Sequence, residues 1–420
     1  SFRITNNKTS STAAPSLYFK NDDDLYVSLA LLNSCISQVY MDLLNPTVGL
    51  KLANVEAVPA INFEKMAVFL RSSCENNIAL SKEDWDSYEI SWDFEQHPLV
   101  KRKELHSLEK CYLTWKTECE NRFLKMKDNE EHINVVILKE YGLENEVSCE
   151  VPEKSISVHR IFDTKEDIPV SMDGSYYVRT KRDEIVSLIS YSVGCMFGRY
   201  SLDKKGIVNA GAPLNVNEYV SFSVDKDNII PICDDEYFKD DIVGRFVEFI
   251  KIVYGADSLD DNLTFIAKAL GGKGSPREII RNYFVNDFYK EHCATYSGTV
   301  GKRPIYWLFD AGKNNSFKAL IYMHRYQPDT IARIRTDYVH EQQARYRTAI
   351  ADLEQRIANT STGERVKLKK KLATLQAQDT EIRTYEEKIH HLADQMISIN
   401  LDDGVKKNYA IFQDVLAKIK

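Results

Sequence analysis

Residues 302–326 read KRPIYWLFDAGKNNSFKALIYMHRY, a stretch in which eleven of twenty-five side chains are aromatic or large aliphatic and six are basic. Residues 305–309 form an apolar run of the kind that builds a strand. Residues 312–316 favour a turn, and residues 317–326 resume an apolar segment. Two interpretations are open at this point. The stretch is either a core strand, turn and helix with solvated basic side chains, or an apolar backing that holds five cations against nucleic-acid phosphates: Lys302, Arg303, Lys313, Lys318 and Arg325.

The same stretch resembles the C-terminal region of the PglX family, the adenine-specific DNA methyltransferases of BREX phage-defence systems. Three further stretches are similar to that region and follow in the expected order: DWDSYEISWDF from Asp84, LISYSVGCMFGRYSLD from Leu188 and LDDGVKKNYAIFQDVLAKIK from Leu401. Residues 31–60, LLNSCISQVYMDLLNPTVGLKLANVEAVPA, are similar to the closing segment of the specificity domain in type IIG and related adenine methyltransferases. Together these stretches span most of the chain.

This resemblance implies the target-recognition half of a DNA methyltransferase, with double-stranded DNA as its partner and S-adenosylmethionine as the cofactor of the full-length protein. The catalytic half needs a Gly-rich cofactor loop and an N-P-P-Y loop for the flipped adenine, and the sequence contains neither. Asn45-Pro46-Thr47 lacks the second proline and the aromatic residue. Gly194 and Gly198 fall in a helical pattern, which favours close helix packing. We therefore expect no catalytic residue and no cofactor site in this chain, and no methyl transfer by this chain alone.

The hydrophobic patterns predict an α+β fold, in which a mixed α/β target-recognition core is accompanied by large helical regions. The 420 residues, 43% of them hydrophobic and 28% charged, suffice for several domains with sizeable cores. We divide the chain into the end of a specificity-type segment at 1–62, a helical region at 63–150, a mixed α/β DNA-recognition domain at 151–327, and a C-terminal helical hairpin and tail at 328–420.

A heptad pattern near the C-terminus predicts an antiparallel helical hairpin. One helix carries Leu368, Leu372, Leu375, Ile382, Tyr385, Ile389, Leu392, Met396 and Ile399, with Asp379 as the polar interruption. The facing helix carries Ile331, Ile334, Tyr338, Ile350, Leu353 and Ile357, and residues 359–363 form the turn. The pattern does not distinguish a DNA-binding face from a protein-binding one.

Charge is distributed unevenly along the chain. Residues 263–420 contain 26 Lys and Arg against 18 Asp and Glu, a net charge of +8, whereas residues 1–262 contain 29 against 44, a net charge of −15. This asymmetry favours an anionic partner for the C-terminal part, although helix surfaces often carry an excess of one sign.

Three further basic residues, which lie outside residues 302–326, are candidate DNA contacts. Lys273 lies in the loop GGKGSP, where Ser275, Pro276 and Glu278 also fit an ordinary capped helix start. A helix N-terminus can hold a phosphate, so both interpretations are open. Arg333 and Arg335 lie off the hairpin seam, where we expect them to be accessible, either for phosphate or for pairing with Asp329 and Asp337.

Several local patterns give sharper predictions. Asn21 is expected to cap a single helix that ends at Asn45-Pro46. Ser81 and Asp84 resemble a capping box, and Trp85 and Trp92 are expected to be core anchors. Residues 219–224 and 229–232 flank a turn sequence, which predicts a β-hairpin.

The eight cysteines form no C-x-x-C pair and have no His at zinc-finger spacing, so we expect neither a metal site nor disulfides. Cys35, Cys119 and Cys195 lie in apolar helical patterns and are expected to be buried thiols, which suits a reducing cytoplasm. There is no eighteen-residue apolar run and no signal-peptide pattern, so neither a membrane span nor a membrane partner is expected. The first residues, Ser-Phe-Arg, suggest a processed or truncated piece.

Two functions of different classes remain from the sequence. The first is DNA recognition for an adenine methyltransferase, in which basic residues position the phosphates and other polar residues read the bases. The second is an assembly module, in which the helical hairpin binds other subunits of the BREX defence complex.

Overall fold

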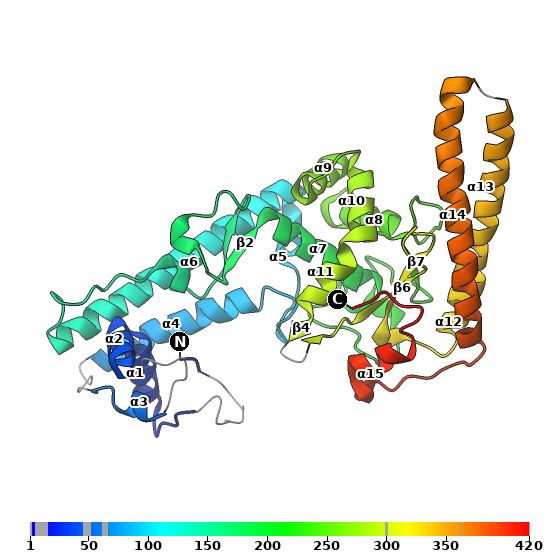
Figure 1. The fold of residues 1–420 in the computed structure, drawn as a ribbon. Coiled ribbons are helices and arrows are strands. Elements are labelled where there is room, and N and C mark those ends of the chain that lie inside the picture. The colour runs from blue at the N-terminus through cyan, green and yellow to red at the C-terminus, as the bar shows by residue number, and fades with distance from the viewer. Residues whose placement is uncertain are drawn as a thin grey trace. The chain divides into compact units, whose positions relative to one another are not determined.

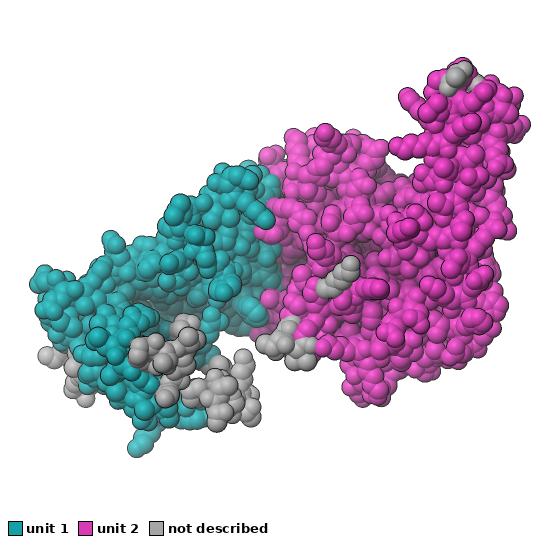
Figure 2. Space-filling model, viewed as in Figure 1, with its two compact units in different colours: residues 1–88, 112–181 teal, residues 89–111, 182–420 magenta. Residues whose placement is uncertain are grey.

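The structure is a computed structural model, and it describes residues 2–4, 16–44, 52–60, 66–298, 301–359 and 361–419. Its class is α+β, as expected, because helices predominate and the strands form small sheets (Figure 1). The residues group into two compact units, each built from two stretches of chain (Figure 2). Unit 1 comprises residues 1–88 and 112–181, and unit 2 comprises residues 89–111 and 182–420. The four-part domain division stays a prediction.

Unit 1 is mostly helical. Its elements are α1 (Asp22–Asn33), α2 (Cys35–Leu44), α3 (Leu52–Glu56), α4 (Ala67–Trp85), most of α6 (Leu108–Tyr141), and the strands β1 (Arg160–Phe162) and β2 (Val178–Thr180). The two strands pair in parallel, with Ile161 opposite Arg179. Helix α1 packs against α4, and a core forms around Leu31, Leu70 and Ile137.

The first helix begins as expected but is broken. The side chain of Asn21 accepts a hydrogen bond from the Asp24 N–H at 2.8 Å, which caps α1. The expected single helix is wrong, however, because the chain bends by 66° between α1 and α2. Asn45-Pro46, the expected end, lies outside the described residues. Where the chain is described, no single helix is long and apolar enough to span a membrane, and α1 with α2 meet that test only as a bent pair.

The expectations for residues 81–92 are wrong. Ser81 and Asp84 lie inside α4, so they form no capping box. Asp84 is instead buried and accepts hydrogen bonds from the backbone N–H and the ring Nδ1 of His159. Trp85 is 52% exposed and Trp92 is 96% exposed, so neither is a core anchor. The spacing of apolar residues in the sequence did not predict that both indole rings are exposed.

Unit 2 contains the remaining elements. Its helices outside the hairpin are α5 (Pro98–Lys101), α7 (Lys181–Met196), α8 (Ile242–Tyr254), α9 (Leu259–Leu270), α10 (Pro276–Asn286), α11 (Phe288–Thr295) and α15 (Gly404–Ile411). Strands β4 (Ser297–Gly298) and β5 (Gly301–Lys302) pair with each other.

Gly194 packs closely, as expected, because a Cβ there would lie 2.4 Å from the ring of Tyr200. Where α7 has ended, Gly198 takes φ +76°, a left-handed conformation that favours glycine.

A three-stranded antiparallel sheet lies at the centre of unit 2, in the order β3 (Ile230–Pro231), β7 (Lys318–Tyr322), β6 (Tyr306–Asp310). Leu308 stands opposite Leu320 in the β6–β7 pair, and Ile230 stands opposite Leu320 on the other side. Residues 415–417 cover the outer edge of β6 through hydrogen bonds with Asp310 and Leu308. An otherwise unpaired edge is thereby closed.

Two predictions of secondary structure near this sheet are wrong. The second half of the stretch 302–326 is strand β7 followed by a short 3-10 turn at 323–325, not a helix. The β-hairpin expected at 219–232 is absent from the described structure, because Ile230 pairs with β7 rather than with residues 219–224. The pairing partner lies ninety positions along the chain, beyond the reach of a local turn pattern.

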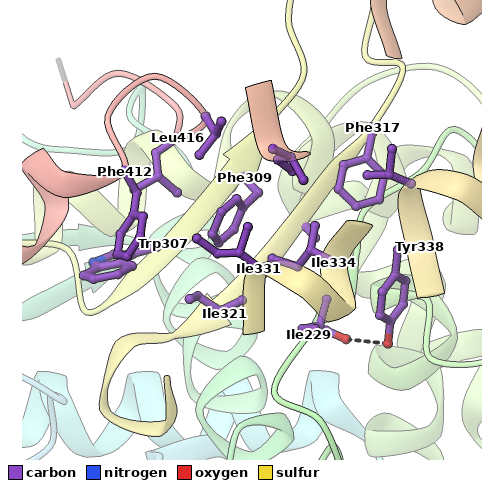
Figure 3. Packing of buried hydrophobic residues seen from close by; sticks show 14 of the residues in the cluster. Ile229, Trp307, Phe309, Phe317, Ile321, Ile331, Ile334, Tyr338, Phe412 and Leu416 are labelled. Atoms are coloured by element: carbon purple, nitrogen blue, oxygen red, sulfur yellow. Dashed lines mark hydrogen bonds between the residues drawn. The ribbon is translucent and has the colours of Figure 1, made fainter. Parts of the chain in front are cut away.

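A large hydrophobic core packs strands β6 and β7 against the C-terminal helices. Trp307, Phe309, Phe317 and Ile321 come from the strands and their connection, and all four are fully buried. Figure 3 shows them beside Ile331 and Ile334 on one side and Phe412 and Leu416 on the other. The Tyr338 hydroxyl donates to the Ile229 carbonyl at 3.2 Å. This core therefore fixes the foot of the helical hairpin to the sheet.

The antiparallel helical hairpin is confirmed. Its first arm runs through α12 (Thr330–Arg333), a π-helical turn (Ile334–Val339) and α13 (His340–Ala358), and its second arm is α14 (Thr362–Ala393). Ile382, Tyr385 and Ile389 are buried in the core, whereas Leu368, Leu372 and Leu375 are half-buried. Helix α14 ends before Met396 and Ile399, so the seam is shorter than the heptad pattern predicted.

Candidate nucleic-acid interface

Lys318 lies inside the protein and is the first correction to the predicted site. It stands opposite Asp310 in the sheet, its side chain is 8% exposed overall, and its ammonium group donates to the Val285 carbonyl at 2.8 Å. Burial raises the pKa of Asp310, and the charge of Lys318 opposes that rise. An ammonium held in this position does not reach a phosphate outside the protein.

Arg325 is the second correction. Its guanidinium is half-buried and donates to the carbonyls of Phe197 at 3.2 Å and Asp225 at 2.9 Å. Burial lowers the pKa of this guanidinium, and the carboxylate of Asp225 partly offsets that effect. Arg325 is thus committed to holding backbone from an irregular part of the chain.

The two arginines at the foot of the hairpin differ from each other. Arg333 is exposed and pairs with Asp329 at 2.7 Å, as one interpretation of the sequence allowed. Arg335 was expected to be accessible, but it is half-buried and bonds to Glu386 of α14 at 2.7 Å. Burial raises the pKa of Glu386, yet hydrogen bonds from Arg335 and His340 outweigh it and leave that pKa below its usual range. Arg335 therefore joins the two arms of the hairpin, and Asp337 is not its partner.

The remaining four predicted cations are accessible to differing degrees, and they lie in three separate places along the chain. Arg303 and Lys313 are exposed, and Lys302, which precedes Arg303 at the end of β5, is half-buried. Lys313 sits in the β6–β7 turn, where Glu381 accepts hydrogen bonds from Asn314 and Ser316 and so supplies a negative charge close by. The structure therefore does not gather the eight predicted residues into one patch.

Lys273 is exposed in the connection before α10, and the helix start beside it is fully capped. Ser275 and Glu278 form the expected capping box, with the Glu278 carboxylate 2.7 Å from the Ser275 N–H. A Cβ at Gly274 would lie 2.8 Å from the same carboxylate. Because Glu278 already supplies a negative charge at this N-terminus, the geometry favours plain capping over phosphate binding at the helix end. Lys273 itself remains free to extend into solvent.

A long irregular segment is the feature that sequence reasoning missed. Residues 197–229, between α7 and β3, contain only one short 3-10 turn, at 216–218. Loops of this length without regular structure are uncommon and usually functional. The available signal was the density of Gly, Asn, Ser and Asp between residues 198 and 228, which marks loop but does not say whether the loop is ordered.

Hydrogen bonds to the sheet and to itself hold this segment in place. The side chain of Asn228 donates to the Tyr322 carbonyl at 3.0 Å and accepts from the Tyr322 N–H at 3.2 Å. The Tyr322 hydroxyl donates to the Asn209 carbonyl at 2.9 Å. Tyr219 closes the loop by donating to the Gly198 carbonyl at 2.6 Å. A loop fixed in this way can present exposed side chains in a defined arrangement.

Residues 205 and 206 of the segment contact Glu95, and two apolar side chains elsewhere in the segment are exposed. Val216 is 71% exposed and Val220 is 80% exposed. The Gly206 N–H donates to the Glu95 carbonyl at 2.7 Å, which places the segment next to the loop that carries Trp92. Lys204 pairs with Glu218, and Lys205 pairs with Glu95 at 2.8 Å. The surface is thus mixed, with apolar groups, one exposed indole and paired charges.

Three carboxylates meet where the segment reaches the hairpin. Oxygens of Asp225, Asp227 and Asp240 lie within 4.8 Å of one another. The Tyr338 hydroxyl oxygen lies 2.9 Å from an oxygen of Asp227 and 2.6 Å from an oxygen of Asp240, and its single proton serves one acceptor at a time. The Ile229 N–H donates to Asp225. Burial, with the neighbouring Asp227, raises the pKa of Asp225 to about 7. A cluster of carboxylates by itself gives no reason to assign a metal.

Comparison with known proteins extends over almost the whole chain. Over 402 residues, 93% of this chain, it is 38% identical to a protein of Lacticaseibacillus casei (strain Zhang) named adenine-specific methyltransferase PglX. Over 420 residues, 96% of this chain, it is 34% identical to one of Escherichia coli O9:H4 (strain HS) named adenine-specific methyltransferase BrxX. The resemblance to PglX is confirmed. The chain spans only 31% and 34% of those two proteins, about a third of their length. No protein-family model matches the chain.

The two glycine-containing stretches considered for a cofactor loop have other roles in the PglX-like chain. Gly194 is inside α7 and packed against Tyr200, and the glycines at 271–274 lead into the capped start of α10. The absence of a cofactor site from this chain stays a prediction.

Proposed function

We propose that this chain is the DNA-recognition portion of a site-specific adenine-N6 DNA methyltransferase of a bacterial BREX phage-defence system. The observation that carries the proposal is the similarity of nearly the entire chain to two proteins named adenine-specific methyltransferase. In this proposal, S-adenosylmethionine and the catalytic residues belong to the part of those proteins that this chain does not match. The present residues would select the duplex sequence whose adenine is flipped out and methylated.

In this proposal, different residues would contact the bases and the phosphates of the duplex. The ordered segment 197–229 has exposed polar and apolar side chains on a rigid support, which suits contact with base edges. Trp92, with 96% of its surface exposed, offers a flat ring for stacking on a base or sugar. The accessible cations Lys273, Arg303 and Lys313 would contact phosphates, which fixes position without reading sequence.

An exchange of chains tests this proposal. The portion of the L. casei PglX that matches this chain is replaced by the chain itself, and adenine methylation is mapped across a plasmid or genome by single-molecule sequencing. Recognition by this chain predicts that methylation moves to a sequence that the parent PglX does not modify. The matched control is the same exchange made with the parent's own segment, re-cloned through the same junctions.

A second function has one specific observation in its favour. The distal half of the α13–α14 hairpin stands away from the rest of unit 2, as Figures 1 and 2 show, and such an arm could hold another subunit of the defence complex. In that case the exchanged protein would keep the methylation sequence of the parent and lose a protein partner instead. Retention of the parent sequence by an active, folded chimera would contradict the recognition proposal.

A further inference from the structure

The far end of the helical hairpin carries a dense group of positive charges. Residues 361–371 read STGERVKLKKK and contain five basic residues against one acidic residue. Lys367, Lys369, Lys370 and Lys371 are all exposed. Over the described residues, none of these four ammonium groups has an ion-pair partner, whereas Arg333, Arg335 and Arg383 elsewhere on the hairpin are paired. We name these four residues the lysine tip.

The helical geometry spreads the lysine tip around the outside of the hairpin. Successive residues of an α-helix are turned by about 100°, and Leu368 and Leu372 face the seam with α13. Lys367 and Lys371 therefore lie on one flank of that seam, Lys369 lies on the other, and Lys370 faces directly away. An anionic surface that approaches the flank of Lys367 and Lys371 meets both of these charges.

The lysine tip stands well outside the core of unit 2. Ile382 is fully buried in that core, and Lys371 and Lys367 lie eleven and fifteen positions earlier on α14. A rise of 1.5 Å per residue places them about 16 to 23 Å from Ile382 along the helix axis. Figure 1 shows this half of α13 and α14 projecting as a pair of helices without further cover from unit 2. The helix pair stays packed there, because Leu353 of α13 is only 3% exposed.

This arrangement is internally unfavourable without an external anion. Lys367 and Lys371 are four positions apart, and Lys367 and Lys370 are three apart, so like charges face each other along α14. A polyanion would relieve this repulsion. Lysine ammonium groups contact phosphates as flexible point charges, so this contact would carry no sequence preference.

We propose that the lysine tip binds the phosphate backbone of duplex DNA beside the recognised sequence, within about one helical turn of it. The inference rests on the proposed DNA-recognition function and adds a second, sequence-independent contact to it. The projection of about 16 to 23 Å is shorter than the roughly 34 Å of one turn of duplex. The hairpin thus lengthens the footprint on DNA without taking part in sequence selection.

The test compares two variants of this chain, each with four exposed lysines replaced by Gln, which is a good helix former. The tip variant carries K367Q, K369Q, K370Q and K371Q. The control variant carries K110Q, K139Q, K154Q and K165Q, four exposed lysines that lie outside the hairpin. The variants have the same net charge. Binding to duplexes of about 12 and about 35 base pairs is measured by fluorescence anisotropy between 50 and 200 mM salt.

Because the four lysines face different sides of α14, we expect a duplex to contact about two of them at once, so the log–log salt slope on the long duplex falls in magnitude by about 2 in the tip variant only. The affinity deficit of that variant is then about 10-fold larger at 50 mM salt than at 200 mM salt. On the short duplex, the tip variant and the wild type should bind alike. Circular dichroism checks that the helix content is unchanged.

Other outcomes overturn the inference in distinguishable ways. Equal loss in both variants would show a general effect of net charge, and no loss in either would show that the tip does not contact DNA, while the recognition function would stand. Loss of a co-purifying BREX subunit with unchanged DNA affinity would assign the tip to assembly. Absence of salt-dependent duplex binding by the wild-type chain would remove the proposed function together with this inference.

Discussion

At the scale of single residues, buried basic side chains hold distant backbone segments together through hydrogen bonds. Lys318 donates to the carbonyl of Val285, and Arg325 donates to the carbonyls of Phe197 and Asp225. Each side chain replaces the water that would otherwise solvate those carbonyls, and a buried carbonyl without a donor is costly. The basic side chains of the stretch 302–326 therefore serve two purposes, and the exposed Arg303 and Lys313 remain available to a ligand.

Replacing Arg325 by Met should destabilise unit 2 by about 2 to 4 kcal/mol, because two carbonyls lose charge-assisted hydrogen bonds. The free energy of unfolding is measured by urea titration followed through tryptophan fluorescence. The matched control, Arg333→Met, is exposed and should change stability by no more than about 0.5 kcal/mol. Unchanged stability with weakened DNA binding would restore Arg325 to the list of phosphate contacts.

His292 makes stability depend on pH. Burial, with the charge of Arg199 nearby, lowers its pKa from 6.5 to about 3, and its neutral Nε2 accepts from the N–H groups of Ile305 and Tyr306. Between those two values the unfolded chain binds a proton that the folded chain does not, so acid favours unfolding. The contribution is complete above pH 6.5 and is lost as pH falls toward 3, by about 2 kcal/mol at pH 5.

The variant His292→Gln keeps an acceptor for both N–H groups but cannot be protonated. We expect the decrease in the free energy of unfolding between pH 7.5 and pH 5 to be smaller in this variant than in the wild type by about 2 kcal/mol. His391→Gln, at an exposed position of α14, is the control and should leave the pH profile in place. A wild-type profile retained by His292→Gln would show that other groups cause the acid sensitivity.

At the scale of elements, the two halves of the hairpin differ in what they stabilise. The proximal half contributes Ile382, Tyr385 and Ile389 to the core beneath the sheet, and Arg335 joins it to the first arm. The distal half is held by half-buried leucines and Leu353 alone. The proximal half is therefore structural, and the distal half is an arm whose surface is available for binding.

This difference predicts unequal costs for equivalent truncations. Ile382→Ala removes a fully buried side chain and should lower the free energy of unfolding by about 2 to 5 kcal/mol. Leu372→Ala, in the half-buried distal seam, should cost less than about 1.5 kcal/mol. Denaturant midpoints of the two variants decide the point. Equal costs would mean that the distal arm is packed as firmly as the core.

At the scale of the whole molecule, the uneven distribution of charge is the property most relevant to a ligand. The net charge of the chain is −7, yet residues 263–420 carry an excess of eight positive charges. Several of those charges are neutralised internally, as at Arg281, Arg335 and Arg345. Over the described residues, Lys273 and Arg303 on connections and the four residues of the lysine tip are exposed, where a duplex could reach them.

The whole chain should therefore bind duplex DNA weakly and with strong dependence on salt. If about six phosphates are neutralised, the slope of log affinity against log salt is about −5. Fluorescence anisotropy with an unrelated duplex measures this slope, and a duplex that contains the recognised site should have higher affinity with a similar slope. A slope near zero would favour the assembly function.

The sequence alone determined the elements whose signals are local. The helix start capped by Ser275 and Glu278 is present, and the antiparallel helical hairpin is present, although α14 ends earlier than its heptad pattern predicted. Caps, turns and periodicity act between residues a few positions apart, so a single sequence contains the necessary information. Similarity to PglX was also visible in the sequence, because it depends only on residue order.

Only the tertiary structure decided which side chains are accessible and which strands pair. Strand β3 pairs with β7 across ninety positions, Lys318 and Arg325 are tied to distant carbonyls, and Trp92 is left exposed. The order of the segment 197–229 likewise depends on Tyr322, more than ninety positions beyond its end. Burial and long-range hydrogen bonding arise from residues brought together by folding, and no spacing rule within the sequence specifies those partners.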